Sequence, residues 1–120
     1  MINQPPATSI DTADLPQVIT TFLDAQFAHD ADAAVPLCLP DAVVTDEGRT
    51  FCGHDKIRDW VTNAASEFTY TTELTGASRL DDTHYGAIHH LEGDFPGGVA
   101  DLHFRFALRD GLIETLTIEP

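Results

Sequence analysis

The chain is poor in basic residues. It holds six Lys and Arg against twenty Asp and Glu, which gives a formal net charge of −14 at pH 7 over 120 residues. Such a charge repels phosphate backbones and anionic lipid head groups. We therefore expect no nucleic-acid partner and no membrane partner, and we interpret most of the acid excess as a solvated surface.

Long hydrophobic runs and cysteines are also scarce. No apolar run approaches the roughly 20 residues that span a bilayer, and the opening MINQPPATSIDTADLP lacks the basic and apolar regions of a signal peptide. These absences predict a cytoplasmic protein. Cys38 and Cys52 are the two cysteines, and because they form neither a disulfide framework nor a CxxC pair, we interpret them as small buried side chains.

The length is sufficient for one domain with one hydrophobic core. Residues 1–12 contain two prolines and small polar side chains without apolar periodicity. They are predicted to form a disordered N-terminal tail. Residues 13–120 are predicted to form a single domain, and no internal repeat divides it.

Three helices are predicted in the first half of this domain. The first runs to Phe27 from Asp14, the expected N-cap, with apolar side chains at helical spacing. The second is a turn or two long and is capped by Asp30 or Asp32. The third covers residues 53–65, and the strand AVVTDEG precedes it.

From residue 67 onward the apolar period changes from 3.6 to 2. Four runs rich in β-branched and aromatic residues follow one another, and they are EFTYTTELTGASRL, THYGAIHHLEGDF, VADLHFRFALR and GLIETLTIE. Turn residues separate them, which predicts an antiparallel meander. Helices followed by such a sheet predict an α+β domain, with the helices packed into the concave side of a curved antiparallel sheet.

Turn chemistry predicts the pairing of the strands. A two-residue loop at Gly97-Gly98 would set His89 opposite Phe106 on the inner face, but it also sets Asp94 opposite Asp101, which argues against it. A three-residue loop over residues 109–111 would set Phe106 opposite Glu114. The predicted inner face contains Leu102, Phe104, Phe106, Leu108, Leu112, Leu116 and Ile118, with His89 and Glu114 as its polar members.

The order of elements and three segments resemble the nuclear transport factor two-like superfamily. The segments are PDAVVTDEGRTFCGHDKIRDWV, LTG at residues 74–76 and the closing RDGLIETLTI. This superfamily includes ketosteroid isomerases, SnoaL-like polyketide cyclases, epoxide hydrolases and dehydratases. The resemblance covers residues 15–119 and implies a cone-shaped α+β barrel of the cystatin-like kind, which encloses an apolar pocket and often forms homodimers through its outer sheet face.

The resemblance also implies a role for Asp46. It falls where ketosteroid isomerases place the aspartate that moves a proton between carbons of the substrate. Apolar walls around a carboxylate make it a stronger base. The positions that supply hydrogen-bond donors in those isomerases are Phe22, Val61 and Phe104 here, and none of these side chains donates.

On the predicted register, His89 points into the pocket beside Gly76 and serves as acid or electrophile. The predicted catalytic residues are therefore Asp46, His89 and Glu114, the last as an orienting partner. The predicted pocket-lining residues are Phe22, Phe27, Trp60, Val61, Phe68, Gly76, Tyr85, Leu91, Phe104, Phe106 and Leu116. No cofactor and no metal site are expected, since the adjacent His89 and His90 point to opposite faces of a strand.

Alternative roles remain open for these residues. Asp46 could instead bond backbone amides of the Glu47-Gly48 turn, and His89 could be a satisfied core residue. Two function classes follow. One is a small cofactor-independent isomerase, cyclase or dehydratase that acts on a mostly apolar small molecule. The other is a non-catalytic ligand-binding or dimerisation domain. A cavity of about 300 Å³ or more that contains Asp46 would favour the first.

Two further expectations concern arginines and the outer face. Epoxide hydrolysis is a weaker hypothesis, because it uses an arginine between acids and the candidate arginines are interpreted as outer-face or loop residues. These are Arg49, Arg58, Arg79, Arg105 and Arg109. A homodimer is predicted through the outer sheet face, formed by His90, Glu92, His103, Arg105, Thr115 and Thr117.

Overall fold

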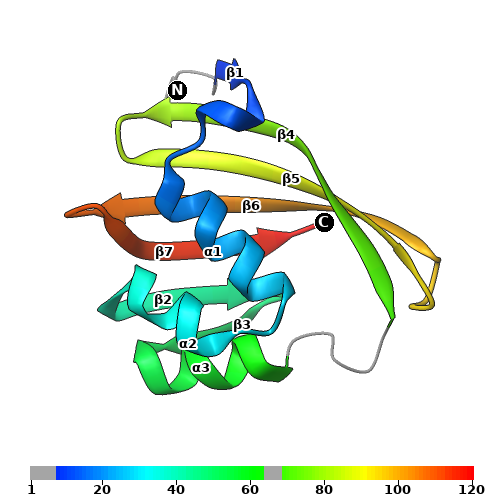
Figure 1. Cartoon of the computed structure of the whole chain (residues 1–120), viewed down its shortest axis with the longest axis horizontal. Helices are drawn as coiled ribbons and strands as arrows, with labels where there is room; N and C mark the ends of the chain where they lie inside the picture. Colours follow the sequence, from blue (N-terminus) through cyan, green and yellow to red (C-terminus); the bar gives the residue numbers. More distant parts are fainter. Residues whose placement is uncertain (1–7, 64–68) are drawn as a thin grey trace.

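In residues 8–63 and 69–120, the part of the chain that the computed structural model describes, seven strands form one sheet whose inner face is covered by helices (Figure 1). The helices are α1 (Gln17–Phe27), α2 (Ala31–Ala34) and α3 (Gly53–Asn63), with 3₁₀ turns at Thr12–Asp14 and Val35–Leu37. The strands are β1 (Thr8–Ile10), β2 (Cys38–Asp46), β3 (Arg49–Cys52), β4 (Tyr70–Asp81), β5 (His84–Gly93), β6 (Val99–Arg109) and β7 (Leu112–Glu119).

The strand order is β1-β4-β5-β6-β7-β2-β3. The predicted meander from β4 to β7 is confirmed, and the α+β class is confirmed with it. The sheet is mixed because β2 pairs with β7 in parallel, whereas its other pairs are antiparallel. The strand that carries Asp46 therefore lies beside the last strand of the chain.

The first helix begins later than predicted. Leu15 and Pro16 are both extended, with ψ of 142° and 140°, so the helix starts at Gln17 and the carbonyl of Pro16 accepts its first backbone hydrogen bonds. A residue that precedes proline is driven toward extended backbone. Asp14 instead ends the 3₁₀ turn, so its prediction as the N-cap is wrong.

The other two helices follow the predictions more closely. The Asp30 carboxylate accepts a hydrogen bond from the amide of Ala33, as expected of the N-cap of α2. The third helix begins at Gly53 as predicted, and its predicted last residues, 64 and 65, lie outside the described residues. None of the helices in the described ranges is long and apolar enough to cross a membrane.

The N-terminal segment is partly ordered. Thr8–Ile10 form β1 and pair with residues 77–79 at the far edge of β4. The prediction of disorder is therefore wrong for these three residues, because alternating backbone hydrogen bonds to an edge strand need no apolar periodicity. The predicted tail residues 1–7 lie outside the described part.

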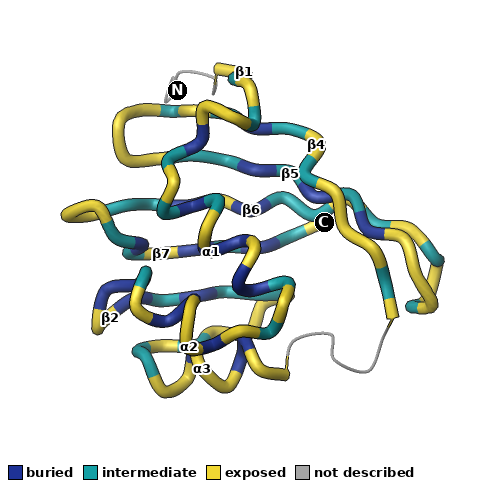
Figure 2. Tube along the Cα trace, in the orientation of Figure 1, coloured by how far each residue is buried: buried dark blue, intermediate teal, exposed yellow. Residues whose placement is uncertain are grey.

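The core lies between the helices and the inner face of the sheet. Its large side chains with less than 2% exposure include Ile19, Phe22, Phe104, Phe106 and Leu116. Figure 2 shows buried positions alternating with intermediate or exposed ones along the central strands. One face of the sheet is therefore buried, as the period of two predicted.

The pairing of β5 with β6 differs from the prediction by four residues. His89 lies opposite Leu102 rather than Phe106, because the hairpin is closed by the Gly93 amide bonding the Gly98 carbonyl, with a longer loop than Gly97-Gly98. An even shift leaves every side chain on its predicted face. The unfavourable pair of Asp94 with Asp101 is removed, because Asp101 lies opposite His90.

The pairing of β6 with β7 corrects the position of Glu114. Asp110 and Gly111 both have positive φ, 56° and 75°, which is a two-residue turn rather than the predicted three-residue loop. A bulge then sets Phe106 opposite Leu116. Glu114 is half-exposed, and its carboxylate lies 2.9 Å from Arg109 Nε, so its prediction as an inner-face residue is wrong.

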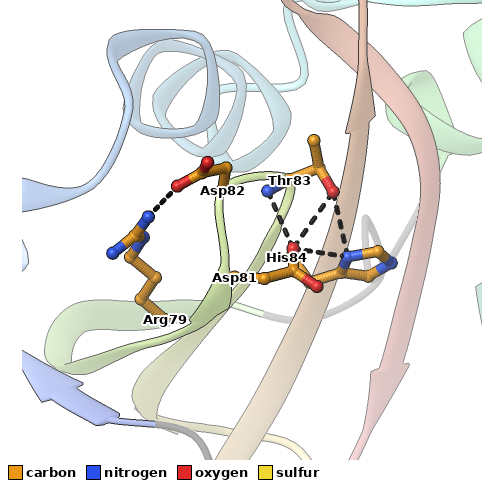
Figure 3. A network of polar contacts seen from close by, with 5 residues as sticks. All are labelled: Arg79, Asp81, Asp82, Thr83 and His84. Carbon is orange, nitrogen blue, oxygen red and sulfur yellow. Dashed lines mark hydrogen bonds and ion pairs between the residues drawn. The ribbon is translucent and has the colours of Figure 1, made fainter.

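The turn between β4 and β5 is fixed by a network of side chains (Figure 3). Asp81 Oδ1 accepts the backbone N–H of Thr83 at 2.9 Å and lies 2.8 Å from His84 Nδ1, while Arg79 pairs with Asp82. The Thr83 amide and then the His84 ring hold the pKa of Asp81 at about 2. This turn anchors one end of the β4–β5 pairing.

Candidate functional site

A cavity of about 470 Å³ opens where β2 and β7 end, beside the last turns of α1 and α3. Its apolar wall includes Phe27, Phe51, Trp60, Leu91, Phe104 and Ile118. Its polar lining includes Gln26, Asp46, Glu47, Arg49, Asp59 and Glu119. A concavity that combines an aromatic and aliphatic wall with convergent polar groups is typical of a small-molecule site.

Asp46 lies in the wall of this cavity. It is the last residue of β2, opposite Arg49 on β3 and beside Ile118 on β7. Its Oδ2 accepts a hydrogen bond from Trp60 Nε1 at 3.0 Å, and no described residue bonds its Oδ1. The carboxylate is thus held at the cavity by an indole N–H from α3, and its second oxygen is free of hydrogen bonds from the described residues.

Trp60 is itself fixed by packing. Its side chain is 4% exposed and lies parallel to the ring of Phe22 at 6.4 Å between centroids, with the ring of Phe51 at 6.3 Å. Helical spacing places Trp60 three residues after the fully buried Ile57. The donor that orients Asp46 therefore belongs to the core.

His89 is buried on the inner face but does not line the cavity. Its Nδ1 lies 2.9 Å from Thr72 Oγ1, and its ring lies 4.6 Å from that of Phe27 and 5.3 Å from that of Phe104. Burial lowers the pKa of His89 to about 4, so the imidazole is neutral near pH 7. The ring lies behind two cavity-lining aromatics, with Leu102 rather than Phe106 as its strand partner.

The structure does not bring the three predicted catalytic residues together. Glu114 lies four positions along β7 from Ile118, the strand neighbour of Asp46, which is ~13 Å at about 3.3 Å per residue. It is also ion-paired with Arg109. Only Asp46 of the three lines the cavity.

The predicted lining residues fall into four groups. Phe27, Trp60, Leu91 and Phe104 line the cavity. Phe22, Val61, Phe106 and Leu116 are fully or almost fully buried in the core. Gly76 and Tyr85 line a second hollow of about 610 Å³, which runs along the sheet with Ile88 and Arg105. Phe68 lies outside the described residues.

Sequence reasoning missed several cavity residues, and Arg49 and Gln26 are two of them. Arg49 was expected on the outer face or in a loop, but it lines the cavity, with its guanidinium carbon 5.9 Å from the centroid of Phe51. The two-residue turn at Glu47-Gly48 contained the signal, because such a hairpin sets Arg49 opposite Asp46. Gln26 lies among the buried residues of α1 and was not predicted as a polar member of the site.

Histidines and acids do not form a metal cluster in the described part of the chain. His90 points away from His89 and lies on the outer face, with Nδ1 2.7 Å from Asp101 and Nε2 2.9 Å from Glu92. These two carboxylates, Asp101 first, raise the pKa of His90.

No protein-family model and no curated protein sequence matches the chain. Among solved structures, a candidate polyketide cyclase from Sinorhizobium meliloti is 31% identical, with a TM-score of 0.82 over 92% of this chain and 100% of that one. A Catenulispora acidiphila protein of ketosteroid isomerase-like fold, in complex with trimethylamine, is 18% identical with a TM-score of 0.75, over 88% of this chain and 85% of that one.

A third structure is a Mycobacterium tuberculosis protein in complex with estradiol-17β-hemisuccinate. It is 15% identical, with a TM-score of 0.69 over 86% of this chain and 90% of that one. The Catenulispora and Mycobacterium structures show similarity of fold alone, whereas the Sinorhizobium structure is similar in sequence as well and covers almost the whole chain. The chain therefore belongs to the nuclear transport factor two-like superfamily, the group of the polyketide cyclase-like and ketosteroid isomerase-like proteins.

Proposed function

We propose that this protein is a small enzyme of the isomerase, cyclase or dehydratase kind, which binds a mostly apolar small molecule in the cavity and moves a proton with Asp46. The observation that carries the proposal is the Asp46 carboxylate in the wall of a 470 Å³ cavity, with Oδ2 held by Trp60. This volume exceeds the roughly 300 Å³ from which small-molecule sites begin.

In the proposed step, Asp46 Oδ1 accepts a proton from a carbon next to a carbonyl group and returns it to another atom of the same molecule. The Trp60 N–H fixes the orientation of the carboxylate, so the free oxygen faces the ligand. A positioned base of this kind contributes about 10²–10⁴-fold to a rate. The chemistry needs no cofactor, because the proton starts and ends on the substrate.

Negative charge develops on the carbonyl oxygen during this step and requires a donor. The family's donor positions, Phe22, Val61 and Phe104, are apolar and at most 1% exposed here. Arg49 lines the same cavity opposite Asp46 and carries five N–H donors. We assign the stabilisation of the oxygen to Arg49, and we leave His89 outside the step because it does not line the cavity.

The relatives support the class of ligand. The Sinorhizobium meliloti relative is described as a candidate polyketide cyclase, and the Mycobacterium tuberculosis structure holds an estradiol derivative. Polyketides and steroids are both mostly apolar, and the wall of this cavity is built mainly from aromatic and aliphatic side chains. A ligand of this character matches the site.

Two other functions have an observation in their favour. A non-catalytic binding domain is favoured by the apolar side chains at Phe22, Val61 and Phe104. Epoxide hydrolysis is favoured by Arg49, which shares the cavity with the carboxylates of Asp46 and Asp59. An acid, an arginine and a second acid around one cavity is the arrangement that this hypothesis required.

The test combines binding with turnover. Trp60 is the single tryptophan, so its emission reports estradiol entering the cavity, and migration of the double bond in a β,γ-unsaturated 3-ketosteroid is followed by ultraviolet absorbance. Asp46→Asn keeps an acceptor for Trp60 but removes the base, and it should lower turnover at least about a hundredfold with binding retained. Asp41→Asn, an exposed site on the same strand, is the matched control.

The outcomes separate the candidates. Binding without turnover in the wild type, or equal turnover in both variants, would reject Asp46 catalysis and leave the binding domain. Hydrolysis of an epoxide that is lost in Arg49→Gln would establish the third candidate. Unchanged Trp60 emission with every steroid tested would reject the cavity as a small-molecule site.

A further inference from the structure

The cavity carries an excess of negative charge. Four carboxylates line it, and Arg49 is the basic side chain among the described lining residues. Glu119 forms an ion pair with Arg105, but Asp46, Glu47 and Asp59 make no ion pair with any residue in 8–63 or 69–120. Even when Arg49 is counted against Asp46, two carboxylates at the cavity remain uncompensated.

Aromatic rings and a helix end add to this potential. The rings of Phe27, Phe51, Trp60, Tyr70 and Phe104 surround the same space. The faces of such rings attract cations. The cavity also lies at the C-terminal end of α1, where the helix dipole leaves about half a negative charge.

Gln26 gives a second and independent sign of a polar ligand group. It belongs to the last turn of α1, lines the cavity and is only 5% exposed. Its Oε1 has no hydrogen-bond partner among the described residues. A buried carbonyl oxygen without a donor costs about 1–3 kcal/mol, and a molecule in the cavity would supply that donor once the Gln26 amide rotates toward it.

We propose that the cavity selects a mostly apolar molecule that carries a protonated amine, with Gln26 accepting one of its N–H bonds. The proposal rests on the proposed function, since it names the class of small molecule that the same cavity takes. A protonated amine neutralises charge on the uncompensated carboxylates, is attracted to the aromatic faces and donates a hydrogen bond to the Gln26 oxygen. A neutral hydroxyl satisfies Gln26 alone, and a carboxylate satisfies none of the three.

The experiment compares three rigid molecules that differ in one head group. 1-Aminoadamantane, 1-adamantanol and 1-adamantanecarboxylate share an apolar body and are cationic, neutral and anionic near pH 7. Their affinities are measured by calorimetry and by Trp60 emission. We expect the amine to bind about tenfold more tightly than the alcohol and the carboxylate to bind most weakly, because the attraction of the ammonium to the carboxylates exceeds the cost of removing it from water by a small margin.

Charge variants on α3 test the source of this preference. Asp59→Asn should reduce the ratio of amine to alcohol affinity severalfold. Asp55→Asn makes the same change at another exposed position of the same helix, outside the cavity lining, and it should leave the ratio unchanged. Gln26→Leu should weaken both the amine and the alcohol, since each loses the same acceptor.

Equal affinity for the amine and the alcohol, or tighter binding of the carboxylate, would overturn the amine proposal and leave the small-molecule site intact. Binding of estradiol without binding of any adamantane would do the same. If neither estradiol nor any adamantane binds, both this proposal and the proposed function fail. An equal fall of the ratio in Asp59→Asn and Asp55→Asn would assign the preference to overall charge rather than to the cavity.

Discussion

The hydrogen bond from Trp60 to Asp46 predicts a measurable coupling between the two side chains. Trp60→Phe removes the N–H and part of the ring, while it keeps an aromatic group between Phe22 and Phe51. A hydrogen bond to a charged group is worth about 1.5–3 kcal/mol, and because Asp46 is only half-buried, we take the lower end. The lost ring area adds about 1 kcal/mol.

Trp60→Phe should therefore lower the free energy of unfolding by about 2.5 kcal/mol. The assay is urea unfolding followed by circular dichroism, since the variant lacks tryptophan emission. In a double-mutant cycle with Asp46→Ala, the coupling energy should be about 1.5 kcal/mol. Phe51→Leu is the control, because it loses contact with Trp60 without touching the hydrogen bond, and its effect should add to that of Asp46→Ala. A coupling below about 0.5 kcal/mol would refute the reasoning.

Three further predictions concern titration, packing and assembly. By nuclear magnetic resonance, His89 should titrate near pH 4, so the free energy of unfolding falls as the pH is lowered from 6.5 toward 4. His90 should titrate above pH 6.5, so its contribution to the free energy of unfolding is complete below 6.5 and is lost as the pH rises through its raised pKa. The reverse order of the two values would contradict the assigned faces. Gly93→Ala should lower the stability measured by thermal unfolding by about 2 kcal/mol, because a Cβ there would lie 2.3 Å from a backbone carbonyl oxygen. Gly86→Ala is the control, since its Cβ would meet a side-chain hydroxyl at 2.6 Å that can rotate away. Equal losses of stability in the two variants would refute this prediction. The homodimer through the outer sheet face remains a prediction: light scattering should give a dimer at micromolar concentration and a monomer for Ile88→Glu, and a monomeric wild type would count against it.

The order and type of the elements follow from the sequence because period and turn chemistry are local signals. The buried stripe of α1 and the four strands of the meander are examples, since each is read within a dozen residues. The cap of α2 is local as well: the sequence offered Asp30 or Asp32, and Asp30 takes the position.

The pairing of strands depends on information that the local pattern does not carry. The even shift between β5 and β6 leaves the inner face unchanged, so the alternation of apolar residues is equally satisfied by both pairings. The bulge beside Glu114 resets that alternation and brings Ile113 into the core, where it is fully buried. Glu114 therefore lies outside the site because of a bulge, and no residue type in the sequence indicates where this bulge occurs.

The candidate site was predicted in part for the same reason. Asp46 and Trp60 were each expected at the pocket, but their contact joins a strand end to a helix and could not be read from spacing. Arg49 was missed although the short turn before it fixes its face. The burial of His89 behind Phe27 depends on side-chain packing across three elements, which the sequence does not specify.

The parallel pairing of β2 with β7 has a consequence for how the chain folds. Asp46 lies beside Ile118, so one wall of the cavity is contributed by a strand that follows β2 in the chain only after four other strands. Contacts between such distant segments require closure of a long loop, and they form late and slowly. Until β7 arrives, β2 and β6 each present an unpaired edge next to apolar side chains, a state in which a growing chain is open to aggregation. Pairing of β7 with β2 and β6 thus completes the site and protects the sheet in a single event.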